Sequence, residues 1–221
     1  MKHLTVLLLM LFMLFMATAL AESPDTLLNN GEYSYRVLED GTLTLREYLG
    51  GDRNVTVPAV IDDIPVTMLE GTFYSKPIES VEIPEGITVI GDNTFMGCTK
   101  LEAVMLPSTL SVIRRAAFGN CQVLSDLTVP TGLTRLEDYA FLNCLSLKKI
   151  SLGSALEEIE ESALLIVPDA NDYTKIQLPD ECELFVAEGS AAEEYAKAHN
   201  VAYQLITPEE PSEAAEEPSA E

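Results

Sequence analysis

The chain has 221 residues, 47% of them hydrophobic, and a formal net charge of −23 from 36 acidic and 13 basic residues. This length allows one good-sized domain or two small ones. The excess of acid argues against nucleic-acid binding, which needs clustered Lys and Arg, and against charge-driven docking on anionic lipid. The acidity favours solubility, or the attraction of a basic partner.

Residues 1–21 have the pattern of a signal peptide. A lysine precedes a long apolar run, and small residues precede a cleavage site before Glu22. The apolar run is too short to span a bilayer comfortably. We therefore expect a secreted, extracellular protein that is released or associated with the cell surface, with no membrane span in the mature chain. Residues 22–31 are expected to form an N-terminal linker.

A unit of about 23 residues repeats through the centre of the chain, most visibly as a column of phenylalanines. Phe73, Phe95, Phe118 and Phe141 stand 22, 23 and 23 residues apart, and Leu164 takes the next position. Four apolar columns and a cysteine column keep the same step, and prolines end the strand segment in three coils. The apolar columns are Ile90, Ile113, Leu136 and Ile159; Ile78, Leu101, Leu124 and Leu147; Val81, Val104, Leu127 and Ile150; and Ile83, Leu106, Val129 and Leu152.

Each repeat predicts one coil of a solenoid. Apolar residues two apart, such as Val104 and Leu106, face the same side of an extended strand, and the next residue, Pro107, ends that strand because it has no N–H. A second apolar segment, such as residues 111–113, crosses the opposite wall, and the phenylalanine fills the space between the walls. One unit cannot bury its apolar side alone, so stacked units share a continuous core.

These columns resemble the BspA-like leucine-rich repeat, whose pattern is roughly L-x-x-I-x-L-P-x-x-L-x-x-I-G-x-x-A-F-x-x-C, and the resemblance covers residues 32–206. It implies a β-dominated α/β solenoid, a right-handed superhelix of short parallel strands with an N-terminal β-hairpin and a C-terminal helix cap. It also implies that residues 35–45 form the hairpin, with Asp40-Gly41 as its turn, and that residues 55–66 form a first irregular repeat.

The chain departs from the family pattern in two ways. The glycine after the isoleucine column is kept only as Gly91. The fifth unit is lengthened around residues 167–171, so we interpret it as degenerate and transitional, with Leu164 in place of phenylalanine. The residues that replace the glycine in later coils are Arg114, Glu137 and Glu160.

The end of the repeat region predicts a cap. Ser190 and Glu193 form a capping box, which predicts a short helix over about residues 190–199. Asn200 can end the helix, and residues 201–206 can add a final strand that closes the open apolar end of the solenoid. The apolar face of the helix would contain Ala192, Tyr195, Ala196 and His199.

The last residues, 207–221, contain six Glu, three Pro and no aromatic residue. This composition cannot bury a core, so we expect a disordered acidic tail.

Cys98, Cys121 and Cys144 occur once per coil, and two interpretations of them are open. Stacking would place them about 5 Å apart, the spacing of neighbouring strands, so they can form a buried ladder of thiols. Secretion also permits a disulfide, Cys98–Cys121 or Cys121–Cys144, although parallel side chains fit poorly the dihedral angle of about 90° that a disulfide needs. Cys182 lies outside the ladder and is expected to be unpaired.

The mature chain shows no pattern of catalytic or metal-ligating residues. Its single histidine, His199, lies on the predicted cap helix, where we expect a surface or packing role. The two densest polar clusters lack an EF-hand or Asp-rich nonapeptide pattern, so we attribute them to turns rather than calcium. We therefore expect no catalytic residues, cofactor or metal. The two clusters are Asp62-Asp63, and Asp169 with Asn171 and Asp172.

The candidate functional site is the exposed side of the strands, because functional residues of a solenoid lie there. The face runs from acidic in the first repeats to basic at Lys148-Lys149, and Met105 is its one large apolar side chain. A solvated sheet face without a ligand is the competing interpretation. The candidate partner-binding residues are Ser80, Ala103, Asp126 and Lys149 in one row and Glu82, Met105, Thr128 and Ser151 in another, with Glu79, Glu102, Ser125 and Lys148 toward the rim.

We predict a secreted, non-catalytic module that binds a protein through this face, a role that the resemblance to a family of surface and adhesion proteins implies. The alternative is a structural extracellular or cell-envelope spacer that self-associates and has no dedicated ligand. A third hypothesis is an enzyme. Its sign would be a cleft away from the strand face that contains a pair of acidic residues with perturbed pKa values. We expect a monomer without nucleic-acid partners.

Overall fold

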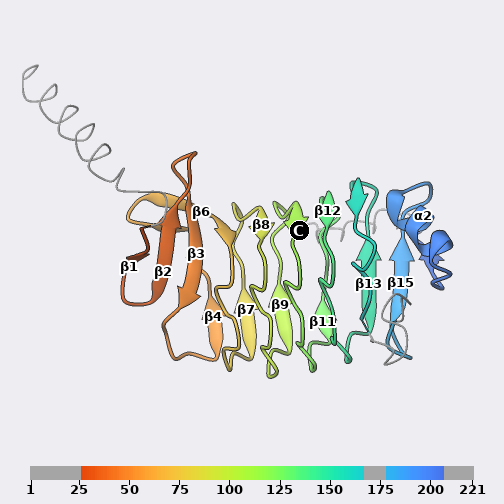
Figure 1. Cartoon of the computed structure of the whole chain (residues 1–221), viewed down its shortest axis with the longest axis horizontal. Helices are drawn as coiled ribbons and strands as arrows, with labels where there is room; N and C mark the ends of the chain where they lie inside the picture. The colour runs from red at the N-terminus through yellow and green to blue at the C-terminus, as the bar shows by residue number, and fades with distance from the viewer. Residues whose placement is uncertain (1–25, 167–177, 207–221) are drawn as a thin grey trace, which may run out of the picture.

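The computed structural model describes residues 26–166 and 178–206. Over these residues the chain is a β-solenoid of about seven turns with one α-helix, and Figure 1 shows the coils stacked side by side along the long axis. The solenoid prediction is therefore confirmed. The predicted signal peptide, residues 167–171 of the lengthened unit and the predicted acidic tail lie outside the described residues.

One wall of the solenoid, here called the strand wall, contains the strands that precede the prolines. Its strands pair in parallel, with Val81 opposite Val104 and Val104 opposite Leu127. The wall is divided into a four-stranded sheet in the order β11-β9-β7-β4 and a three-stranded sheet in the order β13-β15-β16. The strands are β4 (Asn54–Thr56), β7 (Ser80–Glu82), β9 (Ala103–Met105), β11 (Asp126–Leu127), β13 (Lys149–Leu152), β15 (Glu183–Val186) and β16 (Gln204–Leu205).

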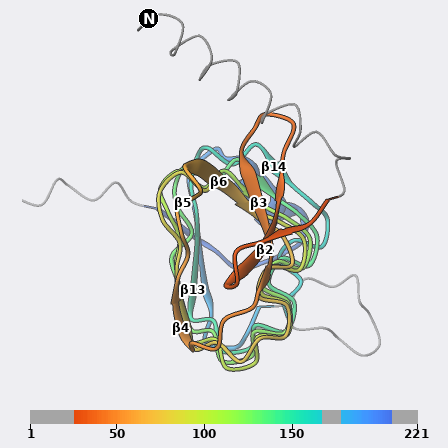
Figure 2. The ribbon, with the colours of Figure 1, turned by 90° about the vertical axis from the view of Figure 1, so that its left-hand side faces the viewer.

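A second wall is a nine-stranded sheet that runs from the N-terminal hairpin to β14 in the order β1-β2-β3-β6-β8-β10-β12-β14, with β5 paired to β6. Figure 2 shows the array end-on, with successive coils superimposed around one core. The strands are β1 (Leu28–Asn29), β2 (Tyr33–Val37), β3 (Leu43–Tyr48), β5 (Val60–Ile61), β6 (Ile64–Leu69), β8 (Val89–Ile90), β10 (Val112–Ile113), β12 (Arg135–Leu136) and β14 (Glu158–Ile159).

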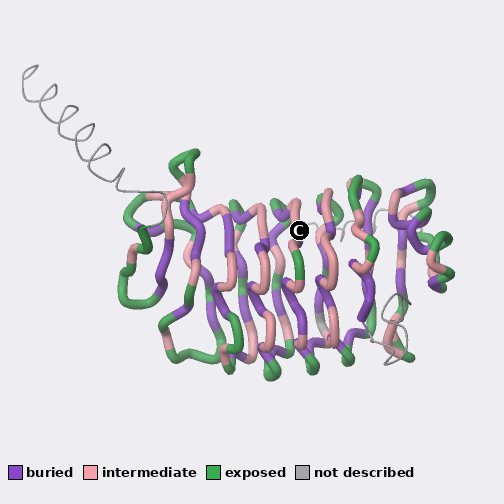
Figure 3. Tube along the Cα trace, in the orientation of Figure 1, coloured by how far each residue is buried: buried purple, intermediate pink, exposed green. Residues whose placement is uncertain are grey.

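The predicted inward columns line the core. Val81, Val104, Leu127 and Ile150 are each at most 6% exposed, and Figure 3 shows buried segments recurring at matching places in successive coils. Two residues of these columns, Leu106 and Ile159, are only partly buried, and Leu106 borders a hollow on the strand wall. Burial of one large apolar side chain contributes about 1.5–3 kcal/mol, so the columns supply the main driving force for stacking.

The phenylalanine column forms a continuous stack of rings inside the solenoid. Phe73, Phe95, Phe118 and Phe141 are fully buried, with consecutive ring centroids 5.3, 5.1 and 5.7 Å apart. Leu164, which is also fully buried, takes the next position. The sequence columns miss the beginning of this stack, where the rings of Tyr33 and Tyr48 continue it at 5.3 and 5.4 Å.

The array opens with the predicted hairpin. β2 and β3 pair antiparallel, and the loop between them is closed by the Leu38 amide, which donates to the Thr42 carbonyl at 2.8 Å. Gly41 has a φ of 84°, the left-handed conformation that a three-residue hairpin loop requires at this position. The hairpin and its Asp40-Gly41 turn are therefore as predicted.

The segment expected to be an N-terminal linker, residues 22–31, needs correction because it contributes a strand. Leu28 lies opposite Tyr35 in the β1–β2 pair, and it packs against the core. The connection is fixed by Asn30, whose side-chain oxygen accepts the amide of Tyr33 at 2.8 Å. An asparagine that binds its own downstream backbone in this way favours a tight turn rather than an extended linker.

Asp62 and Asp63 form the two-residue turn between β5 and β6. Ile61 pairs with Ile64 across it, and both aspartates have positive φ, 50° and 64°. This is the conformation of a type I′ hairpin turn, in which Asp is favoured. The turn interpretation therefore holds for this pair, whereas the cluster of residues 169–172 lies outside the described residues.

A row of hydroxyls joins neighbouring coils along the second wall. Thr88, Ser111 and Thr134 donate to the carbonyl of the equivalent residue in the preceding coil, at 3.3, 3.1 and 3.0 Å. The same residues accept and donate in turn, so Thr88 and Ser111 each belong to two of these bonds. Side-chain bonds therefore supplement the short β pairs of this wall.

The three repeating cysteines are buried and unpaired. Each thiol donates to the carbonyl of the phenylalanine column one coil earlier: Cys98 to Phe73 at 2.9 Å and Cys121 to Phe95 at 3.1 Å, with Cys144 repeating the pattern. Burial raises the pKa of Cys98 well above its ordinary value. The ladder of free thiols is thus the arrangement found, and neither disulfide alternative is present. Cys182 is also free, and burial raises its pKa to about 11.

We expect four free thiols per chain when the mature protein is unfolded in guanidinium without reductant. In the folded protein at pH 8, the three ladder thiols should react with a disulfide reagent far more slowly than free cysteine, because all three are fully buried and out of the reagent's reach. Ellman's titration with and without denaturant measures both values. Two free thiols under denaturing conditions would show that a disulfide forms.

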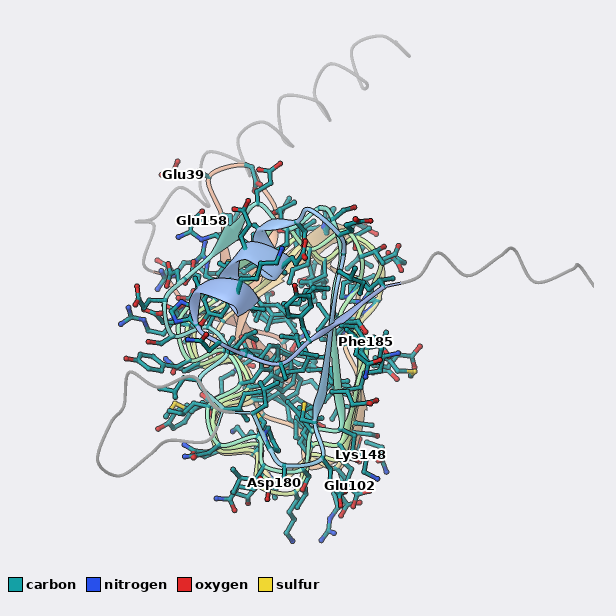
Figure 4. All side chains as sticks on the ribbon, turned by 90° about the vertical axis from the view of Figure 1, so that its right-hand side faces the viewer. Glu39, Glu102, Lys148, Glu158, Asp180 and Phe185 are labelled. Carbon is teal, nitrogen blue, oxygen red and sulfur yellow. The ribbon has the colours of Figure 1, made fainter. Side chains whose placement is uncertain are left out.

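The helix α2 (Ala191–Ala198) lies across the end of the stack (Figure 4). Ser190 caps it by accepting the Glu193 amide at 3.2 Å, as predicted. The Glu193 carboxylate accepts the Gly189 amide at 2.8 Å. In a capping box this side chain accepts the amide of the N-cap residue itself, whereas here it accepts the amide of the residue before Ser190. At the other end the Val201 amide donates to the Ala196 carbonyl at 2.9 Å, and Asn200 has a φ of 55°. These features define a Schellman motif.

Glu193 also holds the cap to the final strand segment. Its carboxylate accepts a bond from Lys197 at 2.6 Å and one from the Tyr203 hydroxyl at 3.0 Å. Bonding to Lys197, the Gly189 amide and Tyr203 lowers the pKa of Glu193 to about 2, from an ordinary value of 4.5. The charged carboxylate therefore stabilises the folded state.

Replacement of Glu193 by glutamine should destabilise the protein at pH 7 and have little effect near pH 2. A lowered folded-state pKa gives stability that is full above pH 4.5 and is lost as the pH falls toward 2. Thermal melts of the wild type and Glu193→Gln at several pH values measure this dependence. Glu194→Gln, on the exposed side of the same helix turn, is the control. A pH-independent difference for Glu193→Gln would contradict the carboxylate's role.

Candidate functional site

The outward positions of the strand wall form one continuous surface. Glu82, Met105, Thr128 and Lys149 are exposed, whereas Ser80, Ala103 and Ser151 are half-buried. Asp126 lies in β11, in register with Ala103. The structure therefore brings the predicted rows together on adjacent strands, and their part in binding stays a prediction.

Met105 is the most prominent apolar side chain of this surface, with 60% of its area exposed. Two hollows flank it. The larger has a volume of about 520 Å³ and is lined by residues of β9, of the turn that follows β9 and of the segment after β11, including Ser108, Thr128 and Thr131. The smaller, of about 360 Å³, lies over β4, β7 and β9. Met105 lines both hollows and so forms the ridge between them.

Polar side chains from two neighbouring strands line part of the smaller hollow. The Ser80 hydroxyl donates to Asn54 at 2.7 Å, and the Thr56 hydroxyl lies 3.5 Å from a carboxylate oxygen of Glu82. These groups come from neighbouring strands because Asn54 pairs with Ser80 and Thr56 with Glu82 in the β4–β7 register. The hollow can therefore exchange hydrogen bonds with a polar partner beside the apolar contact at Met105.

The basic end of the face carries an aromatic residue that the sequence analysis missed. The Lys149 ammonium lies 4.6 Å from the centre of the Phe185 ring, and Figure 4 shows Phe185 and Lys148 along the same wall. Phe185 pairs with Ser151 in the β13–β15 register. Lysine over an aromatic face is a favourable cation–π contact. Residues 183–186, Glu-Leu-Phe-Val, alternate between outward and inward positions as β13 does. The lengthened unit before them breaks the 23-residue step, so the sequence does not show which residues of β13 they pair with.

The acidic end of the face is partly neutralised. Glu79 forms an ion pair with Arg53 at 2.6 Å. Glu82 and Glu102, in contrast, have no ion pair within the described residues. The exposed Arg53–Glu79 pair contributes little to stability. Because Glu79 is paired, the carboxylates of Glu82 and Glu102 are the charges that a partner would meet at this end.

Other chemistry is not assembled in the part of the chain that the structure describes. Those residues hold no group of three or more His, Cys, Asp or Glu placed to bind a metal ion. His199 packs on Tyr195, with ring centroids 4.3 Å apart, which agrees with the expected packing role. Within the same residues, no helix is long and apolar enough to cross a membrane.

Solved structures with a similar fold include bacterial leucine-rich repeat proteins and a pneumococcal antigen. A leucine-rich repeat protein from T. pallidum aligns with a TM-score of 0.59 and 22% identity, over 82% of this chain and 98% of its own. The pneumococcal vaccine antigen PcpA aligns at 0.54 and 18% identity, over 81% and 49%. A leucine-rich repeat protein from Bacteroides ovatus aligns at 0.52 and 24% identity, over 73% and 43%. The chain thus spans less than half the length of the last two proteins.

A search of curated proteins finds no match. A family model, in contrast, matches six copies of its unit over residues 67–185, more than half of the chain. Its description is BspA type leucine rich repeat region. The match covers the four stacked phenylalanines and the strand-wall strands from β7 to β13. The chain therefore belongs to the family of BspA-type leucine-rich repeat proteins.

Proposed function

We propose that this chain is a non-catalytic module that binds another protein through the strand wall, with Met105 at the centre of the contact. Leucine-rich repeats are generally protein-interaction modules. The observation that carries the proposal is an exposed methionine between two hollows of the strand wall. A flexible, polarisable side chain in that place suits a contact that must adapt to a partner.

The energetics favour Met105 as the main contact residue. Full burial of a methionine side chain is worth about 1.5–3 kcal/mol, and most of this side chain is exposed in the free protein. Residues that dominate binding lie near the centre of an interface, surrounded by contacts that exclude water. The other residues that line the two hollows, polar and apolar, would form such a surround.

Met105→Asp should weaken binding to any partner of this face by about tenfold or more, equivalent to about 1.4 kcal/mol. The immobilised mature chain would be tested against purified candidate surface proteins, with Kd measured for each binder. Val123→Asp is the matched control, because Val123 is also an exposed apolar residue but lies in a turn outside the strand wall. An equal loss for both variants, or no loss for Met105→Asp, would move the site off this face.

The proposal includes export from the cell. Its support is the signal-peptide pattern of residues 1–21, with a cleavage site before Glu22. N-terminal sequencing of protein collected outside the producing cells should begin at Glu22. Retention of the full-length chain in the cytoplasm would contradict this part.

A second candidate function is the spacer that self-associates. It is favoured by β16, a strand that pairs on one side with β15 and ends the three-stranded sheet. Leu205 and Ile206 at this edge are 43% and 37% exposed, and open strand edges are templates for pairing with another chain. Light scattering over a concentration series separates the two functions, since the binding module should stay monomeric.

A further inference from the structure

One turn of the solenoid binds a carboxylate from its own chain. Glu85 follows Pro84 and reaches the equivalent turn of the next coil, residues 107–110. There its two oxygens accept the Ser108 amide at 2.9 Å, the Ser108 hydroxyl at 3.0 Å and the Thr109 amide at 3.1 Å. These bonds, led by the one from the Ser108 backbone, lower the pKa of Glu85. Two adjacent amides and a hydroxyl therefore form a carboxylate-binding turn.

The same turn is repeated one coil later without its carboxylate. Residues 107–110 are closed by the Leu110 amide, which donates to Pro107 at 3.2 Å, and residues 130–133 are closed by the Leu133 amide, which donates to Pro130 at 3.1 Å. Ser108 stands where Glu85 stands in the coil before, and its side chain is too short to reach across. Within residues 26–166 and 178–206, the amides of Thr131 and Gly132 have no hydrogen-bond partner.

This second turn borders the larger hollow of the strand wall. Ser108, Pro130 and Thr131 are among the residues that line the volume of about 520 Å³ beside Met105. Thr131 and Gly132 are exposed, so a group entering the hollow can reach their amides. Thr128, which also lines the hollow, adds a hydroxyl on the same side. The turn thus offers the same donors that hold Glu85, in a space large enough for a side chain from another protein.

We propose that the turn at residues 130–133 binds the carboxylate of an Asp or Glu side chain of the partner protein, next to an apolar contact on Met105. This inference rests on the proposed binding role of the strand wall. It adds that the partner presents a carboxylate where it meets residues 130–133. Consecutive backbone N–H groups in a turn form a concave site for an anion, and hydrogen bonds to a charged acceptor are the strong ones. The net charge of −23 opposes any anion at long range, so recognition depends on these short-range bonds.

Acetate is the probe for the site itself. In ¹⁵N-labelled mature protein, residues 22–221, the amide protons of Thr131 and Gly132 should move downfield and saturate as sodium acetate is added. The amides of Ser108 and Thr109 should not respond, because Glu85 already occupies them. Sodium chloride at equal ionic strength controls for salt, and Gln122 and Val123, in an exposed turn of the same repeat, report non-specific shifts.

Two variants exchange the occupied and open turns. Glu85→Ala should make Ser108 and Thr109 respond to acetate as Thr131 and Gly132 do. Ser108→Glu should shift the Thr131 and Gly132 amides without acetate, abolish their response and weaken binding of the partner. No saturable shift in the wild type, or an unchanged response in Ser108→Glu, would overturn the inference.

The two proposals can fail separately. Loss of partner binding in Met105→Asp together with no acetate response would overturn this inference alone. An acetate response with binding unaffected by Met105→Asp would overturn the proposed function.

Discussion

Phe118→Ala should destabilise the protein by about 3–5 kcal/mol, the range for removing a buried phenylalanine. Phe118 is fully buried and stacks on two neighbours, with ring centroids 5.1 Å from Phe95 and 5.7 Å from Phe141. Truncation leaves a cavity in the middle of the stack, where coils on both sides lose a contact. For a domain of this size the melting temperature should fall by roughly 6–20 °C, because 1 kcal/mol corresponds to roughly 2–4 °C. Thermal melts followed by circular dichroism measure it.

Phe118→Leu is the matched control for this prediction. Leucine occupies the same column naturally at Leu164, where it is fully buried. The variant should therefore keep most of the stability and lose about 1.5 kcal/mol or less, as for other hydrophobic exchanges that nearly conserve volume. A melting temperature of Phe118→Ala within a degree of the wild type would show that the ring does not fill the core.

Gly91→Ala should destabilise the protein by about 1–3 kcal/mol, although glycine-to-alanine changes at compatible sites usually stabilise. A Cβ at Gly91 would lie 2.6 Å from the Leu69 carbonyl oxygen and 2.8 Å from the Met68 methyl group. The carbonyl cannot retreat freely, because it accepts the Gly91 amide at 2.6 Å. Strain must therefore separate β6 from the coil that follows it. Equilibrium unfolding in urea gives the free-energy difference.

Arg114→Ala is the control one coil later in the same column. The Arg114 amide donates to the Ile90 carbonyl at 2.9 Å, which is the equivalent bond, and this position accepts a full side chain. Removing the arginine side chain should change stability by no more than about 0.5 kcal/mol. If Gly91→Ala were as stable as the wild type, the close approach at Gly91 would not require glycine.

The repeat period made most of the core predictable. Five columns with a constant step assign which residues face inward, and a residue such as Val104 needs no other information to be placed in its strand. The same logic identified Met105 as outward and apolar. The helix cap was predictable for a different reason, because the bonds of Ser190 and Asn200 are local and their residue types favour those positions.

The other features could not be predicted, because they join residues that are not separated by the constant step of the repeat. Tyr33 and Tyr48 extend the ring stack, but they belong to an antiparallel hairpin whose spacing differs from that of the repeats. Phe185 pairs with Ser151 across 34 residues, because the lengthened unit separates them in the chain. The carboxylate-binding turn could not be predicted from the sequence either. Glu85 and Ser108 occupy the same position of successive repeats but differ in residue type. Only the structure shows that the Glu85 side chain reaches the turn that contains Ser108.

The bonds between coils have a consequence for the order in which the chain can acquire structure. The hydroxyl row and the thiols bond to carbonyls only 21–26 residues earlier. A coil therefore finds its partners as soon as the preceding coil exists, and no contact of this kind waits for a distant part of the sequence. Folding by such short-range closures costs little loop entropy. A solenoid of this design can assemble vectorially, from its hairpin toward its cap, while the rest of the polypeptide is still being delivered.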